Sequence, residues 1–410
     1  MSTESSSRRK RRGALLLGAL GLLCAGLLSA TDSRSLGAWW LSSAAANVAT
    51  PNLRGHPLMR LAEDAPLPAS PDASTALRGN PEARLIAAYR LVAQNRLDDA
   101  LAATNALVQQ HPNFRLALLL QADLLAAHVA PLPTWGGNMA AREGIAELRE
   151  EARQRLAALR ERPPAGSVPT EFVQLPPSVP FAIAVDASRS RLYLFENSAA
   201  GAKLVDDFYI SIGKQGVDKL TEGDQKTPLG IYFTTTRPDP RAPQDRRLGA
   251  GALPINYPNA YDRTRGRTGK SILLHGVPAD NYSRPPQDSD GCVVLANDDL
   301  LALAQRLPER DTPVLISRHI DWRAPEAARA TAAPDFRQAF ERWSAERLAS
   351  AQAPAAITDT SIVAWRDDRE LMVVTFREQA GPRQKFDHVM RQYWGRDGAD
   401  WRIVAEGQVH

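Results

Sequence analysis

The chain has 410 residues, 44% of them hydrophobic, and a formal net charge of +4 at pH 7, so it is long enough for two or three domains. Residues 1–12 carry five basic side chains against one acid, Glu4, which accounts for the whole net charge and leaves the rest of the chain neutral. Because a nucleic-acid interface needs a basic face on the folded part, this distribution argues against nucleic-acid binding.

The first predicted element is a membrane-directing segment at residues 1–31. A basic cluster at 8–12 precedes an uncharged stretch, 13–31, that is rich in leucine, glycine and alanine. This pattern is typical of a signal peptide or a signal anchor, whereas a buried core helix is the alternative. Cleaved or retained, the segment would place everything after it in the periplasm or cell envelope. We expect the membrane to be contacted only here.

The next region is predicted to be helical. Residues 32–80 are rich in Ser, Ala and Pro without a sustained period, which predicts a linker. From 81 to 162 the apolar residues recur at helical spacing and resemble a tetratricopeptide-type hairpin with further helices. Because a stable array of such repeats needs about three, two interpretations stay open. The region is either a docking site for a partner protein or a small helical cap on the domain that follows.

A mainly-β domain is predicted at residues 178–318, after a proline-rich boundary at 163–180. The long span 237–270 is rich in arginine and is either a lid that supplies carboxylate-binding donors or a solvated surface loop. A short helix is expected after residue 297, capped by Asn297. The predicted strands are 181–185, 191–195, 204–212, 230–236, 271–275 and 313–316.

The last part of the chain, 334–408, is predicted to be a small α+β domain. A helix from 334 to about 352 precedes strands at 360–365, 370–376, 386–394 and 401–405, with a hairpin turn at Gly395–Gly398. A helix followed by an antiparallel sheet resembles the nuclear-transport-factor-like fold, often a non-catalytic appendage. Its aromatic residues either line a ligand pocket or pack in the core; they are Trp365, Phe376, Tyr393, Trp394 and Trp401.

One cysteine stands out as a candidate nucleophile. The chain has two cysteines, and Cys24 lies in the segment predicted to be removed or membrane-embedded, so Cys292 has no intramolecular disulfide partner. A lone thiol in an oxidising compartment is better explained by reactivity than by packing, although a small buried core residue is the alternative. His275 lies seventeen positions upstream, a spacing that suits two sides of one pocket. No histidine pair has a metal-binding spacing and no glycine-rich phosphate loop follows a strand, so we expect neither a metal nor another cofactor.

The chemistry expected of the pair is acyl transfer. A neighbouring imidazole stabilises the reactive thiolate, so Cys292 would attack a carbonyl carbon and His275 would protonate the departing amine. The backbone N–H groups of Gly291 and Cys292 are expected donors to the oxyanion that forms. The chain order fits neither papain-like enzymes nor caspases.

At these residues the sequence resembles the L,D-transpeptidase (YkuD-type) catalytic domain. The chain has His275-Gly276, a loop at 277–288, and then Ser289-Asp290-Gly291-Cys292-Val293. The resemblance extends over about 180–318 and implies a mainly-β catalytic domain inside a multidomain α+β chain. Four upstream segments carry it further: Ile183–Asp186, Arg191–Phe195, Ser211–Lys214 and Thr227–Gly230.

Two positions depart from the family pattern, in which many members carry histidine where this chain has Asp290 and arginine or asparagine where it has Val294. Because the resemblance makes the upstream histidine the base, Asp290 leaves the catalytic pair intact and puts only substrate contacts in doubt. Tyr282 and Arg284, in the loop between the catalytic residues, are expected by position to touch substrate, as is Asp290.

The resemblance implies that the substrate is a peptidoglycan stem peptide. An L-centre to D-residue bond would be opened to give a thioester on Cys292, and a second amine, from another stem or from a wall-linked protein, would resolve it. Two alternatives stay open. Water could resolve the same thioester, which would make the protein a hydrolase that trims cross-links or detaches wall-bound protein. Alternatively, the changes at Asp290 and Val294 could mark a catalytically silent wall-binding module.

Overall fold

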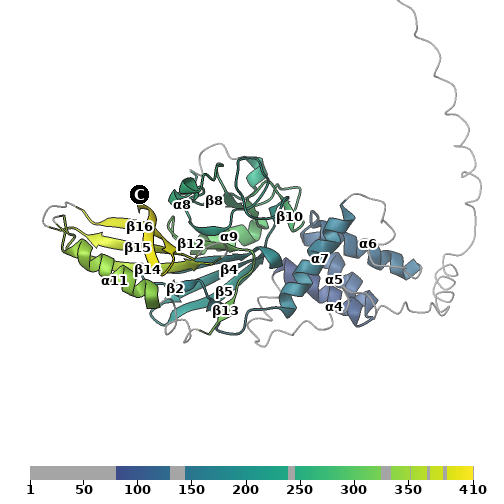
Figure 1. Cartoon of the computed structure of the whole chain (residues 1–410). Coiled ribbons are helices and arrows are strands. Elements are labelled where there is room, and N and C mark those ends of the chain that lie inside the picture. The colour runs from purple at the N-terminus through teal and green to yellow at the C-terminus, as the bar shows by residue number, and fades with distance from the viewer. Residues whose placement is uncertain are drawn as a thin grey trace, which may run out of the picture. The chain divides into compact units, whose positions relative to one another are not determined.

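A computed structural model describes residues 80–129, 144–238, 245–324, 334–350, 352–366, 370–381 and 386–409 of the chain (Figure 1). The predicted export segment and almost all of the predicted linker therefore lie outside the described residues. Within the described ranges, no helix combines the length and the apolar character needed to cross a membrane.

The predicted helical region is confirmed and consists of helices that share one core. The α4 helix begins where the Asn80 side chain accepts a hydrogen bond from the Glu82 N–H at 2.8 Å, with Pro81 in its first turn. Apolar residues at helical spacing, such as Leu85, Leu120 and Leu156, are buried against one another. The helices are α4 (Pro81–Ala93), α5 (Leu97–Gln110), α6 (Arg115–Val129) and α7 (Ile145–Arg160).

The centre of the next domain is a mixed five-stranded sheet in the order β5-β4-β3-β12-β7. The β12 strand runs parallel to β3 and antiparallel to β7. Nearly every residue of β3 and β12 is buried, as expected for strands covered on both faces. The strands are β3 (Phe181–Asp186), β4 (Arg191–Ser198), β5 (Gly201–Tyr209), β7 (Gly230–Phe233) and β12 (Pro313–Ser317).

Two smaller sheets carry the residues singled out as catalytic. A three-stranded sheet has the order β11-β9-β8, and β10 pairs in parallel with β6. The prediction of one strand at 204–212 is wrong, because the chain leaves the large sheet after Tyr209 and Ile212 pairs with Gln287 instead. These elements are β6 (Ile212–Gly213), β8 (Ala252–Pro254), α8 (Ala260–Thr264), β9 (Leu273–His275), β10 (Gln287–Ser289), β11 (Val293–Val294) and α9 (Asn297–Arg306).

The C-terminal sheet is antiparallel, with the order β17-β16-β15-β14-β2, and Figure 1 shows α11 beside it. Its fifth strand, β2 (Phe172–Gln174), comes from the stretch that the sequence assigns to a proline-rich boundary. Gly395 lies inside β16, so the predicted turn is shifted to the two residues after Asp397. The elements are α11 (Pro334–Leu348), β14 (Ala356–Trp365), β15 (Leu371–Gln379), β16 (His388–Asp397) and β17 (Asp400–Val409), while β1 (Val168–Pro169) pairs with β13 (Trp322–Arg323).

Aromatic residues of the C-terminal sheet fill cores on both of its faces. Phe376, Trp394 and Trp401 pack with Phe336 and Phe340 of α11, which favours the core interpretation of these side chains. Val363, Val373 and Tyr393 belong to the same buried cluster as the large sheet of the preceding domain. The predicted architecture, a mainly-β domain between a helical region and a small α+β domain, is confirmed.

Candidate active site

The strand register brings Cys292 beside the strand that ends in His275. β11 pairs in parallel with β9, so that Val293 lies opposite Leu274 and Val294 opposite His275. Neighbouring strands lie about 4.8 Å apart. Cys292 comes immediately before β11, on a bend outside the strand, and is therefore adjacent in the chain to the strand that pairs with the one ending in His275.

The Cys292 thiol is half-buried and lies against a backbone carbonyl. Its S–H donates to the Ser271 carbonyl oxygen, with 3.8 Å between the two heavy atoms. Burial raises the pKa of this thiol most. A hydrogen bond with the Leu273 backbone opposes it, the negative charge of Asp290 adds to it, and the positive charges of Lys219 and Arg284 oppose it more weakly. The net shift of this pKa favours the thiol over the thiolate, and the expected stabilisation of the thiolate by His275 stays a prediction.

The His275 ring is held in one tautomer. The side chain is buried, and Nδ1 lies 2.7 Å from the carbonyl oxygen of Gly276. A ring nitrogen that faces a carbonyl carries the proton, which leaves Nε2 as the basic nitrogen. Burial lowers the pKa of His275, and the positive charge of Arg284 adds to this, while the Gly276 carbonyl and the Asp245 charge oppose it. Both pKa shifts favour the uncharged forms of the two groups, which suits proton transfer from thiol to imidazole during attack.

The turn before the nucleophile is fastened by Ser289. Its buried Oγ donates to the carbonyl oxygen of Cys292 at 2.6 Å and accepts the Gly291 N–H at 3.1 Å. Since that N–H is occupied, the sequence-based assignment of Gly291 as a free oxyanion donor does not hold in this structure, and the Cys292 N–H is the other candidate. Gly291 has a φ of 124°, and a Cβ there would lie 2.7 Å from the Lys226 carbonyl oxygen, so only glycine fits.

Thr227, which belongs to one of the upstream family segments, supports the same turn. Its Oγ1 donates to the Gly291 carbonyl oxygen at 3.0 Å and accepts the Gly213 N–H at 2.9 Å. The threonine therefore joins β6 to the residue immediately before the nucleophile. The sequence placed Thr227 within the family pattern but gave it no role in the site.

Asn297 is the residue that sequence reasoning misassigned. It does not cap α9, whose N-cap residue is Ala296. Instead Oδ1 accepts the N–H groups of Ala250 and Val277 at 2.9 and 3.1 Å, and Nδ2 donates to the Val277 carbonyl oxygen at 2.9 Å. A Cβ on Gly276 would lie 2.2 Å from Asn297 Oδ1. Asn297 thus anchors the chain immediately after His275, and this explains why a glycine follows the histidine.

The three residues expected to touch substrate lie in different surroundings. Tyr282 is buried, with its ring centroid 4.2 Å from that of Phe114, so in this structure its side chain packs in the helical core, and its predicted contact with substrate has no support from its position. Arg284 donates from Nη1 to the backbone carbonyl of Asp288 at 3.0 Å, and its charge affects the pKa of both catalytic groups. Arg284 is therefore the side chain of this loop whose charge affects the pKa of both Cys292 and His275.

Asp290 and Val294, the two departures from the family pattern, are accommodated in opposite ways. The Asp290 carboxylate is exposed, and its Oδ1 lies 3.3 Å from both Lys214 Nζ and Gln225 Nε2. Val294 is buried, and its backbone N–H and carbonyl both bond to Ser211, at 2.8 and 2.9 Å. Asp290 is consequently available at the surface beside Cys292, whereas Val294 is part of the core.

The arginine-rich span 237–270 is largely folded structure in the residues described. Arg267 lies 3.3 Å from Asp262 and 3.5 Å from Asp218, and Arg237 donates to the Ala304 carbonyl oxygen at 2.8 Å, near the end of α9. These side chains hold the domain together and are not free carboxylate-binding donors. Arg241 lies outside the described residues.

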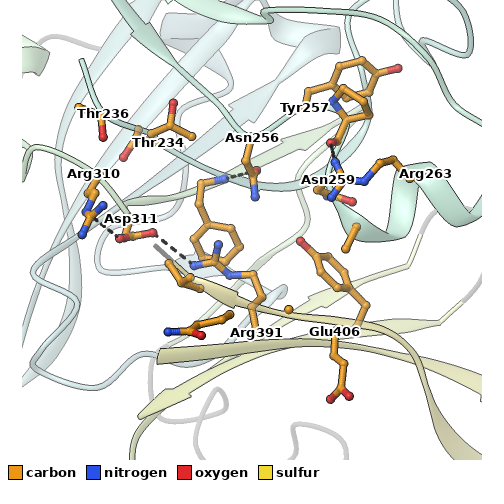
Figure 2. A pocket seen from close by; sticks show the side chains of 18 residues that line it. Thr234, Thr236, Asn256, Tyr257, Asn259, Arg263, Arg310, Asp311, Arg391 and Glu406 are labelled. Atoms are coloured by element: carbon orange, nitrogen blue, oxygen red, sulfur yellow. Dashed lines mark hydrogen bonds and ion pairs between the residues drawn. The ribbon is translucent and has the colours of Figure 1, made fainter. Parts of the chain in front are cut away.

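A cavity of about 560 Å³ lies away from the catalytic pair, between the β7 end of the large sheet and strands β16 and β17 (Figure 2). Arg391 lies in it, with Cζ 3.2 Å from the centroid of the Phe233 ring and Nη2 3.7 Å from Asp311. Of the aromatic residues expected at a pocket, Tyr393 lines this one. Among the described side chains, no group of three or more His, Cys, Asp or Glu residues is arranged to hold a metal ion.

Comparison with known proteins points to one family. Residues 180–316 match the family described as L,D-transpeptidase catalytic domain (YkuD). The Escherichia coli (strain K12) protein named "Putative L,D-transpeptidase YafK" is 30% identical over 113 residues, which cover 27% of this chain and 43% of that protein. The chain thus spans less than half the length of this curated relative.

Solved structures with partial similarity come from other bacteria. Bd1075 of Bdellovibrio bacteriovorus is 23% identical with a TM-score of 0.47, over 59% of this chain and 98% of that one. The helical cell shape determining protein Pgp2 of Campylobacter jejuni is 20% identical with a TM-score of 0.44, over 55% of this chain and 91% of that one.

Proposed function

We propose, on the premise that residues 180–316 form an L,D-transpeptidase catalytic domain, that this protein is a cysteine-dependent acyltransferase acting on peptidoglycan stem peptides. The observation that carries the proposal is that a half-buried thiol, Cys292, comes immediately before β11, the strand paired with the one that ends in His275, whose Nδ1 faces a carbonyl oxygen. The proposal includes export, which rests on the basic cluster and apolar stretch within residues 1–31.

The first half-reaction uses the pair as nucleophile and base. As Cys292 Sγ attacks the carbonyl carbon of the L-residue in the donor stem, its proton passes to His275 Nε2. The resulting oxyanion accepts the Cys292 N–H. The carbon–nitrogen bond to the D-residue then breaks, the departing amine takes the proton from the imidazolium, and a thioester remains on Cys292.

The second half-reaction transfers the acyl group. An acceptor amine loses a proton to His275 Nε2 as it attacks the thioester carbon, and the sulfur leaves and recovers the proton. Water in place of the amine would give hydrolysis through the same steps, so the hydrolase alternative differs only in the acceptor. The silent wall-binding alternative has less support, because the chain keeps a half-buried thiol at Cys292 next to the strand that pairs with the one ending in His275.

The test uses the purified full-length chain and a carbapenem, a β-lactam that acylates a nucleophilic thiol. We expect a mass increment on intact protein that peptide mapping places on Cys292, and no increment on Cys292→Ala. His275→Ala should slow acylation, whereas His388→Ala, a matched loss of an imidazole in the C-terminal sheet, should not. Folded wild-type protein that forms no adduct would support the silent module.

Defined stem peptides then identify the acceptor. With a donor tetrapeptide and an amine acceptor, a new amide product indicates transfer, whereas a shortened peptide alone indicates hydrolysis. Turnover that survives Cys292→Ala would rule out the mechanism.

A further inference from the structure

The loop between the catalytic residues, residues 277–288, is held from outside its own domain. We call it the connecting loop. Tyr282 inserts its ring between aromatic side chains of the helical region, 4.2 Å from Phe114 and 5.1 Å from His111 between ring centroids. The Tyr282 N–H donates to the Asn113 carbonyl oxygen at 3.2 Å, and Asn113 Nδ2 donates to the Ala279 carbonyl oxygen at 3.0 Å. The turn between α5 and α6 therefore fixes the loop through both backbone and side chains.

A second attachment joins the loop to buried charges. Ser283 Oγ donates to Glu151 Oε1 at 2.7 Å, and Glu151 pairs with Arg155 at 2.8 Å, both on α7. The Arg155 guanidinium lies over the Tyr209 ring at 3.7 Å, and the Tyr209 hydroxyl donates to the Arg284 carbonyl oxygen at 3.0 Å. A continuous set of contacts thus runs from α7, through β5, to the backbone of the loop.

The second attachment is strong because the charged groups behind Ser283 are withdrawn from water. Glu151 and Arg155 are 1% and 2% exposed. Arg155 also bonds to Glu82 at 2.7 Å, and Glu82 bonds to Arg191 of β4 at 2.9 Å. Breaking one partner of such a buried pair leaves an uncompensated charge, which is far more costly than losing a surface pair. The helical region is therefore fastened firmly to the sheet and to the connecting loop.

The residues held in this way come directly before Arg284. With the Arg284 carbonyl held by Tyr209 and its Nη1 bonded to the Asp288 carbonyl, the side chain is directed toward the end of the loop. Its positive charge acts on both Cys292 and His275. Loss of these attachments would free the loop to sample many backbone conformations, and Arg284 would leave this position.

We propose that the helical region, residues 81–160, is a positioning element for the catalytic pair. Tyr282, Ser283 and Asn113 are the positioning residues, through which the helical region holds the connecting loop and Arg284 in place. The proposal rests on the proposed function only in taking Cys292 as the reactive thiol; it holds for transfer and hydrolysis alike. It also favours one of the two interpretations of this region, a helical cap on the following domain, over a docking site for a partner protein.

The experiment measures the rate of Cys292 alkylation by iodoacetamide in the full-length chain, with peptide mapping to separate Cys292 from Cys24. Tyr282→Ala and Asn113→Ala should each slow alkylation up to about ten-fold, because displacing the Arg284 charge lowers the thiolate fraction, and a rise of one unit in the pKa lowers that fraction ten-fold. Tyr282→Phe keeps the ring contacts and should restore the wild-type rate. Asn281→Ala is the matched control, because its side chain bonds only to Asp280 of the same loop among the contacts described.

The pH dependence distinguishes positioning from a merely structural role. Because Arg284 stabilises the thiolate, displacing it should move the midpoint of the alkylation pH profile upward in Tyr282→Ala, Asn113→Ala and Ser283→Ala. Variants that lower the melting temperature but keep the wild-type rate and midpoint would overturn the proposal. Should Tyr282→Ala fail to fold, Asn113→Ala and Ser283→Ala decide in the same way, because each removes a single side-chain bond.

Alkylation needs no stem peptide, so its result is independent of the acyl-transfer assay. Wild-type protein that is alkylated at Cys292 but turns over no stem peptide would refute the proposed function and leave the positioning proposal in place. Equal rates in wild type, Asn113→Ala and Ser283→Ala would refute positioning and leave acyl transfer in place.

Discussion

Replacing Asn297 by alanine tests how the chain after His275 is anchored. The Asn297 side chain makes three hydrogen bonds, two to N–H groups of Ala250 and Val277 and one to the Val277 carbonyl. Each intramolecular bond contributes about 0.5–1.5 kcal/mol net, so Asn297→Ala should lower the free energy of unfolding by about 2–4 kcal/mol. No cap is lost with it, since α9 takes its N-cap from Ala296.

Asn297→Asp separates the two kinds of bond. The carboxylate keeps the acceptor oxygen for both N–H groups but turns a second oxygen toward the Val277 carbonyl, so we expect an intermediate loss of about 1–2 kcal/mol. Urea unfolding gives the free energies, and the alkylation rate of Cys292 reports the site. Asn281→Ala is the control, since this half-buried asparagine of the connecting loop bonds through its side chain to its neighbour Asp280, and it should stay within about 0.5 kcal/mol of wild type. A cost below that limit for Asn297→Ala would refute the anchoring role.

Three further predictions follow from buried groups. Because the Cys292 pKa is raised, Cys292 alkylation should increase with pH to a midpoint above that of a free thiol. Because the His275 pKa is lowered, turnover should fall in acid only below the usual imidazole range. A plateau of alkylation near pH 6 would indicate a preformed ion pair instead. Gly291→Ala should cost about 1–3 kcal/mol and most of the alkylation rate, because its φ of 124° is strained for other residues; wild-type melting would contradict this. Glu82→Gln should lower the free energy of unfolding by about 3–5 kcal/mol, because two buried arginines lose a negatively charged partner. Glu150→Gln, in an exposed pair, should lower it by less than about 1 kcal/mol. Equal urea midpoints for the two variants would show that burial of the pair is unimportant.

Much of the secondary structure was predictable because its causes are local. The amphipathic spacing of 81–162 predicted helices, and the runs at 181–185 and 313–316 predicted buried strands that became β3 and β12. These patterns reflect which face of an element meets the core, and that information lies within a few consecutive residues. The strand at 172–174 was missed because its pairing partner, β14, lies almost two hundred residues away in the chain.

The candidate site divides in the same way. His275 and Cys292 could be named from the sequence, since the chemistry requires those residue types and the flanking glycines at that spacing. The part played by Asn297 could not be named, because the same side chain is suited both to capping a helix and to bonding three backbone groups of a distant loop.

The sequence by itself determined the order of the helical and β regions, the identity of the thiol and imidazole, and the family that they resemble. Only the tertiary structure decided that Tyr282 packs in a helical core, that the Gly291 N–H is already bonded, and that buried charges join α7 to the loop between the catalytic residues. The physical reason is that hydrogen bonding and burial depend on which distant segments meet. The sequence alone does not identify which group a tyrosine ring or a backbone N–H will contact after folding.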